Sequence, residues 1–296
     1  MKYEFIEAHT DEHSVVKMCK VLGVSKSGFY KWKGKHLQGE TEREKKKAEI
    51  KQMICKSYHE NYGTYGSPRI HDDLIEWGYH VSQKTVGRYM KEMGLKAIPE
   101  EKYVVTTDSD HDMTIYPNLV NRQFNVETPN TVWVADITYI WTIEGWLYLA
   151  SIMDLFSRKI VGWNLGSTMR KELIMEALKR AMTLRQPGDG LIHHSDRGAQ
   201  YCSKDYIDEL SEANVQISMS KKGDPYDNAC IESFHATIKK ELIYRSRFKT
   251  RDEATKVINH YISNRYNERR KHSKLGYLSP NNFERNYQRS NLDSIS

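Results

Sequence analysis

Three acidic residues in the second half of the chain have the types and spacing of metal ligands. Asp136 lies in TVWVADITYIW, a run rich in β-branched and aromatic residues that predicts a β-strand. Strand alternation puts it on the face of Val132 and Val134, where an unpaired carboxylate is costly to bury. Asp196 ends the short predicted strand LIHHSD, and 35 residues separate it from Glu232. Carboxylate oxygens suit Mg²⁺ or Mn²⁺, so the three acids predict a metal-dependent reaction site.

Glu232 lies on a predicted helix at about 228–245 that has two faces. An apolar stripe at helical spacing is expected to pack on a sheet, and consists of Ile231, Phe234, Ile238 and Leu242. A second face carries polar residues spaced four, three and four apart: Asn228, Glu232, His235 and Lys239. We expect Glu232 to meet metal ions and the other three to contact the phosphates or bases of DNA. Asp227 is predicted as the N-cap of this helix.

Four motifs in order along the chain resemble those of one protein family. WVADITY resembles its first-aspartate motif, HSDRGAQY the second, and YDNACIESF its glutamate motif. YNERRKHSKLGYLSP resembles the C-terminal motif of the insertion-sequence-three family of bacterial transposases. The spacing itself is the D,D(35)E arrangement of transposases and retroviral integrases. The resemblance covers residues 55–285, most of the chain.

The resemblance implies a ribonuclease-H-like catalytic domain of the α/β class, a mixed sheet flanked by helices, preceded by an all-α helix-turn-helix region. It implies a DNA transposase that binds insertion-sequence ends and catalyses metal-dependent strand cleavage and strand transfer. Asp136, Asp196 and Glu232 would be its catalytic and metal-binding residues. Each active site is expected to use two Mg²⁺ ions, with Mn²⁺ as a substitute.

The same resemblance implies the partners. They are the terminal inverted repeats of the element, its target DNA, a second copy of the chain in at least a dimer, and an upstream-frame product of the same element.

Two other classes of function are open on the sequence alone. One is a DNA-binding regulator derived from a transposase without catalysis, and the presence of all three acids argues against it. The other is a ribonuclease acting on RNA–DNA hybrids. The long helix-turn-helix region argues against that reading, because hybrid cleavage needs no reading of sequence.

Residues 126–285 are predicted to form the domain that positions the acids. The pattern predicts three strands followed by helix, strand, helix, strand, helix and helix. Asp154 is either a fourth carboxylate of the site or a structural residue, and the turn-like DLFSRKIVGW favours the structural role. Of His193 and His194, one is expected to face the site and the other to pack.

Two helix-turn-helix patterns precede this domain. In 14–35, Gly23 breaks an apolar periodicity and Ser25 can cap a second helix. In 63–98, Gly78 and Ser82 have the same roles. The predicted limits are 1–40 and 41–98 for these regions, 99–125 for a linker and 286–296 for a C-terminal tail. Predicted DNA contacts besides those above are Lys26, Lys31, Lys84, Arg88, Arg197, Arg270 and His272.

Composition agrees with a nucleic-acid partner in a reducing compartment. The formal net charge is +6 over 296 residues, and basic residues cluster in 14–35 and 265–274. The four cysteines form no CxxC pair and are expected to be reduced thiols. The sequence contains no signal peptide and no apolar run long enough for a membrane span. We therefore expect a bacterial cytoplasmic protein, associated with the nucleoid when bound to DNA.

Overall fold

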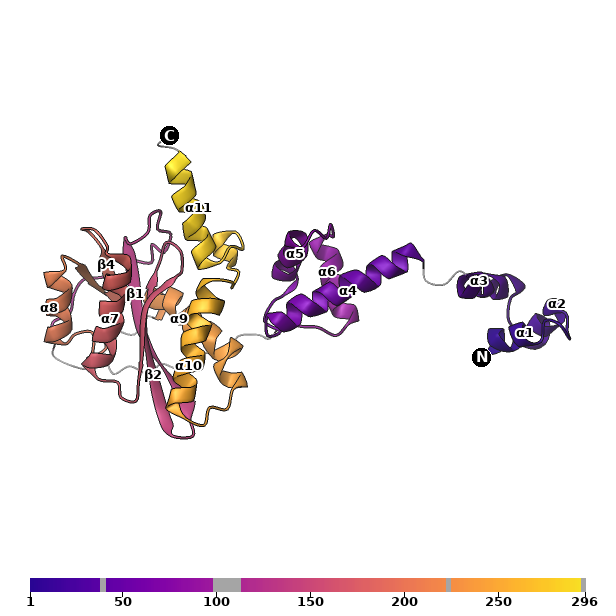
Figure 1. Ribbon diagram of the computed structural model, residues 1–296, viewed down its shortest axis with the longest axis horizontal. Coiled ribbons are helices and arrows are strands. Elements are labelled where there is room, and N and C mark those ends of the chain that lie inside the picture. Colours follow the sequence, from indigo (N-terminus) through magenta and orange to yellow (C-terminus); the bar gives the residue numbers. More distant parts are fainter. Residues whose placement is uncertain (38–40, 98–112, 222–224, 294–296) are drawn as a thin grey trace. The chain divides into compact units, whose positions relative to one another are not determined.

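The computed structural model describes residues 1–37, 41–97, 113–221 and 225–293. The chain divides into two compact units, Met1–Ala97 and Ile98–Ser296 (Figure 1). The described part of the first unit is helical, and the second contains the sheet. No helix among the described residues is both long enough and apolar enough to cross a membrane.

The first helical cluster comprises α1 (Lys2–Ala8), α2 (Val15–Val21) and α3 (Lys26–Leu37). Gly23, at φ +63°, makes the turn between α2 and α3 in a conformation that favours glycine. The Ser25 hydroxyl accepts a hydrogen bond from the Gly28 N–H at 3.0 Å, which caps α3. Phe29 is fully buried against Met18 and Cys19 of α2. The predicted order of helix, glycine turn and capped helix is confirmed.

The second helical cluster comprises α4 (Glu42–Glu60), α5 (Ser67–Glu76) and α6 (Gln83–Glu92). Thr41 and Glu44 form a capping box at the start of α4. Ser82 accepts from the Thr85 N–H at 3.3 Å and caps α6, as predicted. Apolar residues at helical spacing make the common core: Ile50, Ile54, Tyr65, Ile70, Leu74, Val86 and Met90.

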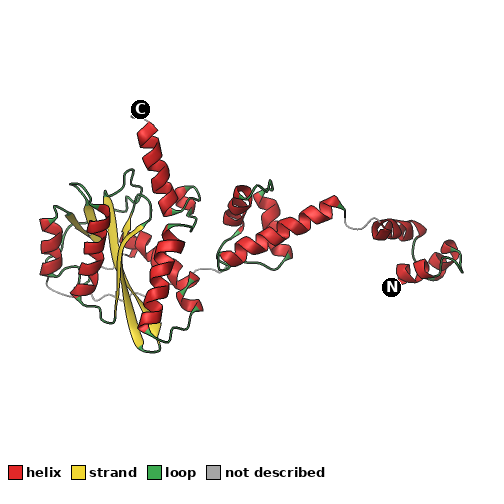
Figure 2. Ribbon diagram, in the orientation of Figure 1, coloured by secondary structure: helices red, strands yellow, loops and turns green. Residues whose placement is uncertain are grey.

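The second unit is built on a mixed five-stranded sheet (Figure 2). Its strands are β1 (Val132–Thr142), β2 (Gly145–Asp154), β3 (Ile160–Gly166), β4 (Ile192–Ser195) and β5 (Gln216–Met219), in the order β3-β2-β1-β4-β5. β1, β2 and β3 are antiparallel, whereas β4 and β5 run parallel to β1. β4 pairs with β1 only at Val132–Val134. The rest of β1 therefore runs on beyond its short neighbour.

Helices cover both faces of this sheet (Figure 1). α7 (Lys171–Arg185) and α8 (Lys204–Glu212) pack on the face of Trp133 and Ile137. α9 (Ala229–Glu241) and α10 (Arg251–His260) pack on the face of Val134 and Ile140. The fold class, an α/β mixed sheet flanked by helices after an all-helical region, is confirmed. The predicted order of strands and helices is confirmed as well.

The structure departs from the predicted limits at two places. Residues 280–285 and most of the predicted tail form one further helix, α11 (Pro280–Asp293). Within the predicted linker 99–125, the described residues 113–125 lie on the catalytic unit, where Val120 is buried in the core. Residues 98–112 lie outside the described residues.

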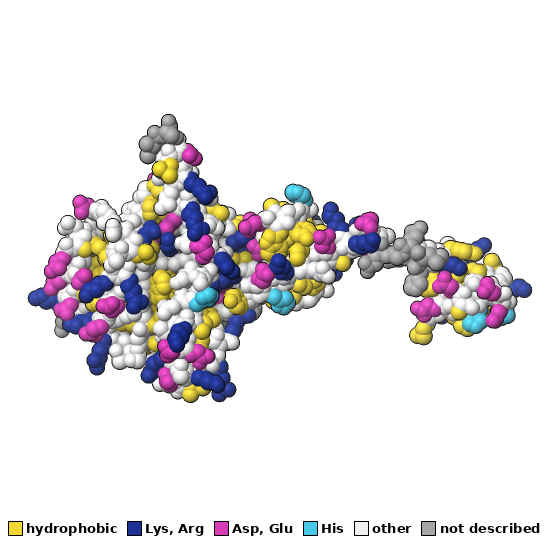
Figure 3. Space-filling model, viewed as in Figure 1, with side chains coloured by type: hydrophobic (Ala, Val, Ile, Leu, Met, Phe, Trp, Pro, Cys, Tyr) yellow, Lys and Arg dark blue, Asp and Glu magenta, His cyan; other side chains and the backbone are white. Residues whose placement is uncertain are grey.

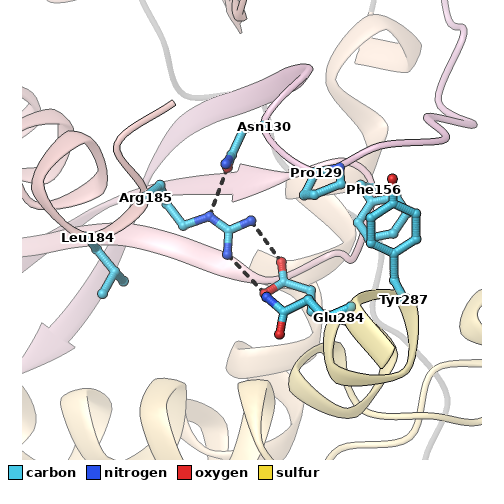
Figure 4. A pocket seen from close by; sticks show the side chains of 8 residues that line it. Pro129, Asn130, Phe156, Leu184, Arg185, Glu284 and Tyr287 are labelled. Atoms are coloured by element: carbon cyan, nitrogen blue, oxygen red, sulfur yellow. Dashed lines mark hydrogen bonds and ion pairs between the residues drawn. The ribbon is translucent and has the colours of Figure 1, made fainter. Parts of the chain in front are cut away.

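Asp154 belongs to a buried ion-pair network that attaches α11 to the sheet. Its carboxylate accepts from the Asn130 and Phe156 N–H groups and from the Arg185 guanidinium, each at 2.9–3.0 Å. Arg185 also donates two hydrogen bonds of 2.9 Å to Glu284 of α11. Figure 4 shows Arg185 reaching from the end of α7 to Glu284 and Asn130. With its oxygens occupied in this way, Asp154 has the structural role that the sequence favoured.

Replacing Glu284 is expected to destabilise the catalytic unit. Glu284→Ala leaves the cations of Arg185 and Lys159 without their shared carboxylate in a largely buried position. We expect the free energy of unfolding to fall by about 3 kcal/mol, as for other broken buried pairs. Chemical denaturation followed by circular dichroism measures this.

Glu268→Ala is the matched control, since Glu268 pairs with Arg285 of the same helix in an exposed position. Its expected cost is under about 1 kcal/mol. Equal losses for the two variants would contradict an anchoring role for the buried network.

Candidate active site

Asp136 is held firmly in the middle of β1. Its side chain is buried on the face covered by α9, and Oδ1 accepts a hydrogen bond from the Ile137 N–H at 2.8 Å. Oδ2 lies 3.2 Å from Nδ1 of His235, which comes from α9. Two different elements therefore fix the orientation of this carboxylate.

Ser151 completes a chain of polar contacts behind Asp136. The β1–β2 register pairs Ser151 with Asp136, and its hydroxyl lies 2.7 Å from Nε2 of His235. An ionised carboxylate only accepts hydrogen bonds, so Nδ1 of His235 donates to Asp136, and Nε2 on the other side of the ring pairs with the Ser151 hydroxyl. All three side chains are buried. The imidazole therefore acts as a bridge that holds the aspartate in place.

Asp196 and Glu232 lie near Asp136. Asp196 follows β4, and its Oδ1 accepts from the Gly198 N–H at 2.9 Å. Burial, followed by the negative charges of Asp136 and Asp196, raises the pKa of Glu232 to about 7. Two carboxylates act electrostatically on a third only at short range in a partly buried site. The fold thus brings together the three acids that the sequence singled out.

The donor set of this site fits a hard divalent cation. It contains three carboxylates, no thiolate, and a concentration of negative charge that a cation would relieve. Within the described ranges, no three His, Cys, Asp or Glu side chains are already arranged as a complete metal site. The chemical type of the ligands therefore fits Mg²⁺.

Two residues of the polar face of α9 are buried against β1, although the sequence analysis expected that face to contact DNA. Asn228 donates from Nδ2 to the Ala135 carbonyl at 3.0 Å, and both Asn228 and His235 are buried. These two side chains tie α9 to the strand that carries Asp136, and their contact with DNA stays a prediction. Their spacing was read correctly, but helical periodicity alone does not distinguish a solvent-facing stripe from a second buried one.

Lys239 lies further along the same face, close to solvent. Its ammonium group is 4.5 Å from the ring centroid of Tyr139 on β1, a cation–π contact. Burial lowers the pKa of Lys239, and the charge of Asp136 opposes this change. A cation near the three acids is well placed for a DNA phosphate, and its contact with DNA stays a prediction.

The other predicted DNA contacts of the catalytic unit differ in accessibility. Arg197 is partly exposed next to Asp196, and its Nε donates to the Ser220 carbonyl at 2.7 Å. Arg270 is buried, with Nε 2.9 Å from Glu241, and its contact with DNA stays a prediction. His272 is partly buried with its ring edge-on to Tyr266. The basic C-terminal motif thus contributes to packing as well as to charge.

The four basic residues predicted to contact DNA in the N-terminal unit are all exposed: Lys26, Lys31, Lys84 and Arg88. On the face seen in Figure 3, Lys and Arg side chains are interspersed with acidic ones and do not form a single patch. Specific placement on the capped helices, more than bulk charge, is what supports these four predictions.

Both histidines before Asp196 are buried, contrary to the expectation for one of them. His193 is 3.0 Å from the Tyr206 hydroxyl, and His194 is 2.8 Å from the Ser218 hydroxyl. Burial lowers the pKa of His193 to about 3 and that of His194 to about 4. Both therefore stay neutral at physiological pH and pack within the sheet.

The turn before α9 also differs from the prediction. The predicted N-cap role of Asp227 is wrong, because Asn228 precedes α9 and Asp227 binds Asn118, Arg122 and the Lys221 N–H instead. These contacts attach the segment at 113–125 to the end of the sheet.

Comparison with known proteins adds the family. Residues 126–225 and 213–280 match models described as integrase core domain, and residues 44–103 match an HTH-like domain. The chain is 39% identical over 284 residues to the transposase InsF for insertion sequence IS3A of Escherichia coli K12, covering 96% of this chain and 98% of that protein. An uncharacterised 31 kDa protein of insertion element IS600 from Shigella sonnei is 43% identical over 91% of this chain and 98% of its own length.

Two viral proteins are among the solved structures that match the chain. One is a simian T-cell lymphotropic virus intasome in complex with PP2A regulatory subunit B56 gamma, 12% identical over 72% of this chain and 69% of that chain, with a TM-score of 0.42. Another is the HTLV-2 integrase catalytic core domain in complex with magnesium, 16% identical over 46% and 88%, with a TM-score of 0.37.

The helical region and the integrase core define a DNA-binding polynucleotidyl transferase of the DDE class, an enzyme of phosphoryl transfer. A divalent metal requirement goes with that core. The chain belongs to the IS3 family of transposases. It is a DNA transposase, and neither a regulator without catalysis nor a hybrid-specific ribonuclease is favoured.

Proposed function

We propose that this transposase binds the terminal inverted repeats of its own insertion sequence, nicks them and joins the freed 3′ ends to target DNA. Asp136, Asp196 and Glu232 would be the ligands of two Mg²⁺ ions, which Mn²⁺ can replace. The observation that carries the proposal is the convergence of three carboxylates from β1, the end of β4 and α9. A dense carboxylate cluster in a basic DNA-binding protein is suited to phosphoryl transfer through metal ions.

The chain's own residues supply orientation. When bound, the metal ions polarise the scissile phosphodiester and activate the attacking water or 3′-OH. Ile137 and His235 fix the Asp136 carboxylate from two sides. Asn228 and the apolar stripe fix α9, and with it Glu232. Lys239 would hold a DNA phosphate about 10 Å from Glu232, two helical turns away.

The N-terminal unit supplies sequence recognition in this proposal. Lys26 and Lys31 on α3, with Lys84 and Arg88 on α6, would contact the terminal repeats through regions 1–40 and 41–98. Joining two ends calls for at least a dimer, and an upstream-frame product of the same element is a further partner. The protein would work in the bacterial cytoplasm, on the nucleoid.

An assay of the full chain tests the proposal. Labelled duplexes carrying the element's terminal repeat are incubated with Mg²⁺ and an unlabelled target plasmid. We expect nicks at the 3′ end of the repeat and labelled plasmid as the joined product. If the chain binds the repeat but yields neither nicked nor joined DNA, its function would be that of a DNA-binding regulator without catalysis.

His235→Phe is expected to weaken metal binding without unfolding the protein. Phenylalanine fills a similar buried space but loses the bonds to Asp136 and Ser151, so the carboxylate is no longer oriented. Loss of a group that orients a metal ligand typically costs 10–100-fold in metal affinity or activity, and we expect roughly that range here. Titration with Mn²⁺ followed by electron paramagnetic resonance, beside the Mg²⁺ dependence of nicking, measures it.

His193→Phe is the matched control, because it removes a buried histidine that bonds to Tyr206 and not to an acid of the site. It should leave Mn²⁺ affinity within about twofold of the unmodified chain. If His235→Phe also leaves Mn²⁺ affinity unchanged, His235 serves only the packing of α9.

A further inference from the structure

Three aromatic residues gather on the hairpin that connects β1 and β2. The β1–β2 register pairs Trp141 with Trp146 and places Tyr139 two residues earlier on the same side of the sheet. The ring centroids of Trp141 and Trp146 are 4.9 Å apart, and those of Tyr139 and Trp146 are 5.3 Å apart, both in edge-to-face contact. We name Tyr139, Trp141 and Trp146 the hairpin aromatic cluster.

The side chains of the hairpin aromatic cluster are more exposed than aromatic residues of a protein core. Trp141 retains 59% of its accessible surface and Trp146 retains 43%, and Ile143 between them retains 60%. Trp133 on the same strand is, in contrast, fully buried under α7 and α8. Large exposed apolar groups that lie together usually mark a binding surface. The hairpin extends beyond the part of β1 that β4 pairs, so the catalytic fold does not need these rings for its core.

Positive charge lies directly beside these rings. Lys239 places its ammonium group 4.5 Å from the Tyr139 ring centroid, and Arg251 donates from Nε to the Trp146 carbonyl at 3.0 Å. Lys239 also shares a helix face with Glu232. Strand alternation puts the cluster on the face of β1 opposite Asp136. Lys239 connects the two faces, because it contacts Tyr139 and also lies within the electrostatic range of Asp136.

We propose that the hairpin aromatic cluster binds unpaired bases of the DNA strand that enters the active site, a proposal that rests on the function proposed above. Aromatic side chains bind single strands by stacking on base faces, whatever the sequence, while cations hold the phosphates. An edge-to-face contact uses only one ring face, so the paired tryptophans keep faces available to bases. Bases within an intact duplex are already stacked and cannot use this surface.

The distance along β1 gives the position of the bound nucleotides. Trp141 is five residues from Asp136, about 17 Å at 3.3 Å per residue. That length equals about five base steps at 3.4 Å each. Because the two side chains point to opposite faces of β1, the stacked bases would lie at least about five nucleotides from the scissile phosphate, on DNA that passes the edge of β1 left unpaired by β4.

Binding measurements on the full chain test the proposal. All proteins carry Asp136→Asn, which prevents cleavage during the titration. The probes are a blunt 20-base-pair duplex of arbitrary sequence and the same duplex with a single-stranded oligo(dT) extension. We expect the chain to bind the extended duplex more tightly than the blunt one. The double variant Trp141→Ala with Trp146→Ala should bind the extended duplex about tenfold or more weakly, as for one lost stacked base. Blunt-duplex affinity should stay within about twofold.

Two controls separate stacking from general damage. Trp141→Phe with Trp146→Phe keeps aromatic faces and should retain most of the preference. Leu184→Ala removes a comparably exposed apolar side chain from α7 and should change neither probe. In the chain with both tryptophans, 2-aminopurine in the extension should lose fluorescence on binding, because a stacked base is quenched.

Several outcomes would overturn the inference. They are an unchanged preference in the alanine variant, equal losses on both probes, or no change in 2-aminopurine fluorescence. A variant that keeps both affinities but loses self-association in light scattering would assign the cluster to a protein interface instead. Failure of the proposed function is separate, since it would appear as the absence of nicking and joining by the unmodified chain in the Mg²⁺ assay.

Discussion

Asp136→Asn is expected to abolish nicking and joining, with rates at least about 10³-fold below the unmodified chain. An amide is a poor ligand for Mg²⁺, and it also lacks the negative charge that holds the donor nitrogen of His235. Binding of terminal-repeat DNA should stay within about twofold, because the N-terminal unit is proposed to supply it. Product gels and mobility shifts on the same protein preparations measure both quantities.

Asp208→Asn provides the comparison for this variant. Asp208 is exposed on α8, away from the sheet face that carries Asp136, so its replacement should leave both rates unchanged. Joining by Asp136→Asn above about a tenth of the unmodified rate would exclude Asp136 as a metal ligand.

Separating the two units is expected to separate recognition from chemistry. The compact unit Met1–Ala97 contains the capped helices and should keep the preference for terminal-repeat over scrambled duplex. A fragment of residues 113–296 should lose that preference, a fall on the order of 10³-fold in specificity. Mobility shifts of each fragment on both duplexes, at one fixed salt concentration, measure the effect.

The second fragment begins at residue 113 for a structural reason. Residues 113–125 contribute Val120 to the catalytic core and Asn118 to the contact with Asp227, so a later start would damage the fold. Circular dichroism of each fragment confirms folding. Specific binding by 113–296 alone would refute the proposed division between the units.

The sequence predicted the fold well for elements whose apolar periodicity matches the faces that are buried in the structure. β1 alternates between two buried faces, and α9 carries its apolar stripe at helical spacing, so both could be placed and oriented from residue types. α11 was missed because much of its stability comes from Glu284 meeting Arg185, two residues 99 positions apart. Segment 113–125 was missed for the same reason, since its position depends on residues far along the chain, through Val120 in the core and the contacts with Asp227.

The sequence singled out the three candidate acids, whose catalytic role stays a prediction, and described their surroundings incompletely. Asp136, Asp196 and Glu232 are separated by whole elements, yet strand parity and helix phase were enough to suggest convergence. His235 was instead expected to face DNA, because helical spacing does not state which of two polar stripes is covered. Ser151 was not considered. The hairpin register that pairs it with Asp136 was the signal that would have found it.

The attachment of α11 affects which truncated gene copies of this element can encode a folded protein. A stop codon or frameshift before the codon for Glu284 would keep all three acids of the active site. It would also remove the carboxylate that pairs with Lys159 and leave Asp154 as the acidic partner of Arg185, so positive charge in a largely buried position would be uncompensated. Such a copy would look catalytically intact in an alignment of motifs and yet encode a protein that folds poorly. Selection on the 3′ end of the reading frame should therefore be as strong as selection on the codon for Glu232.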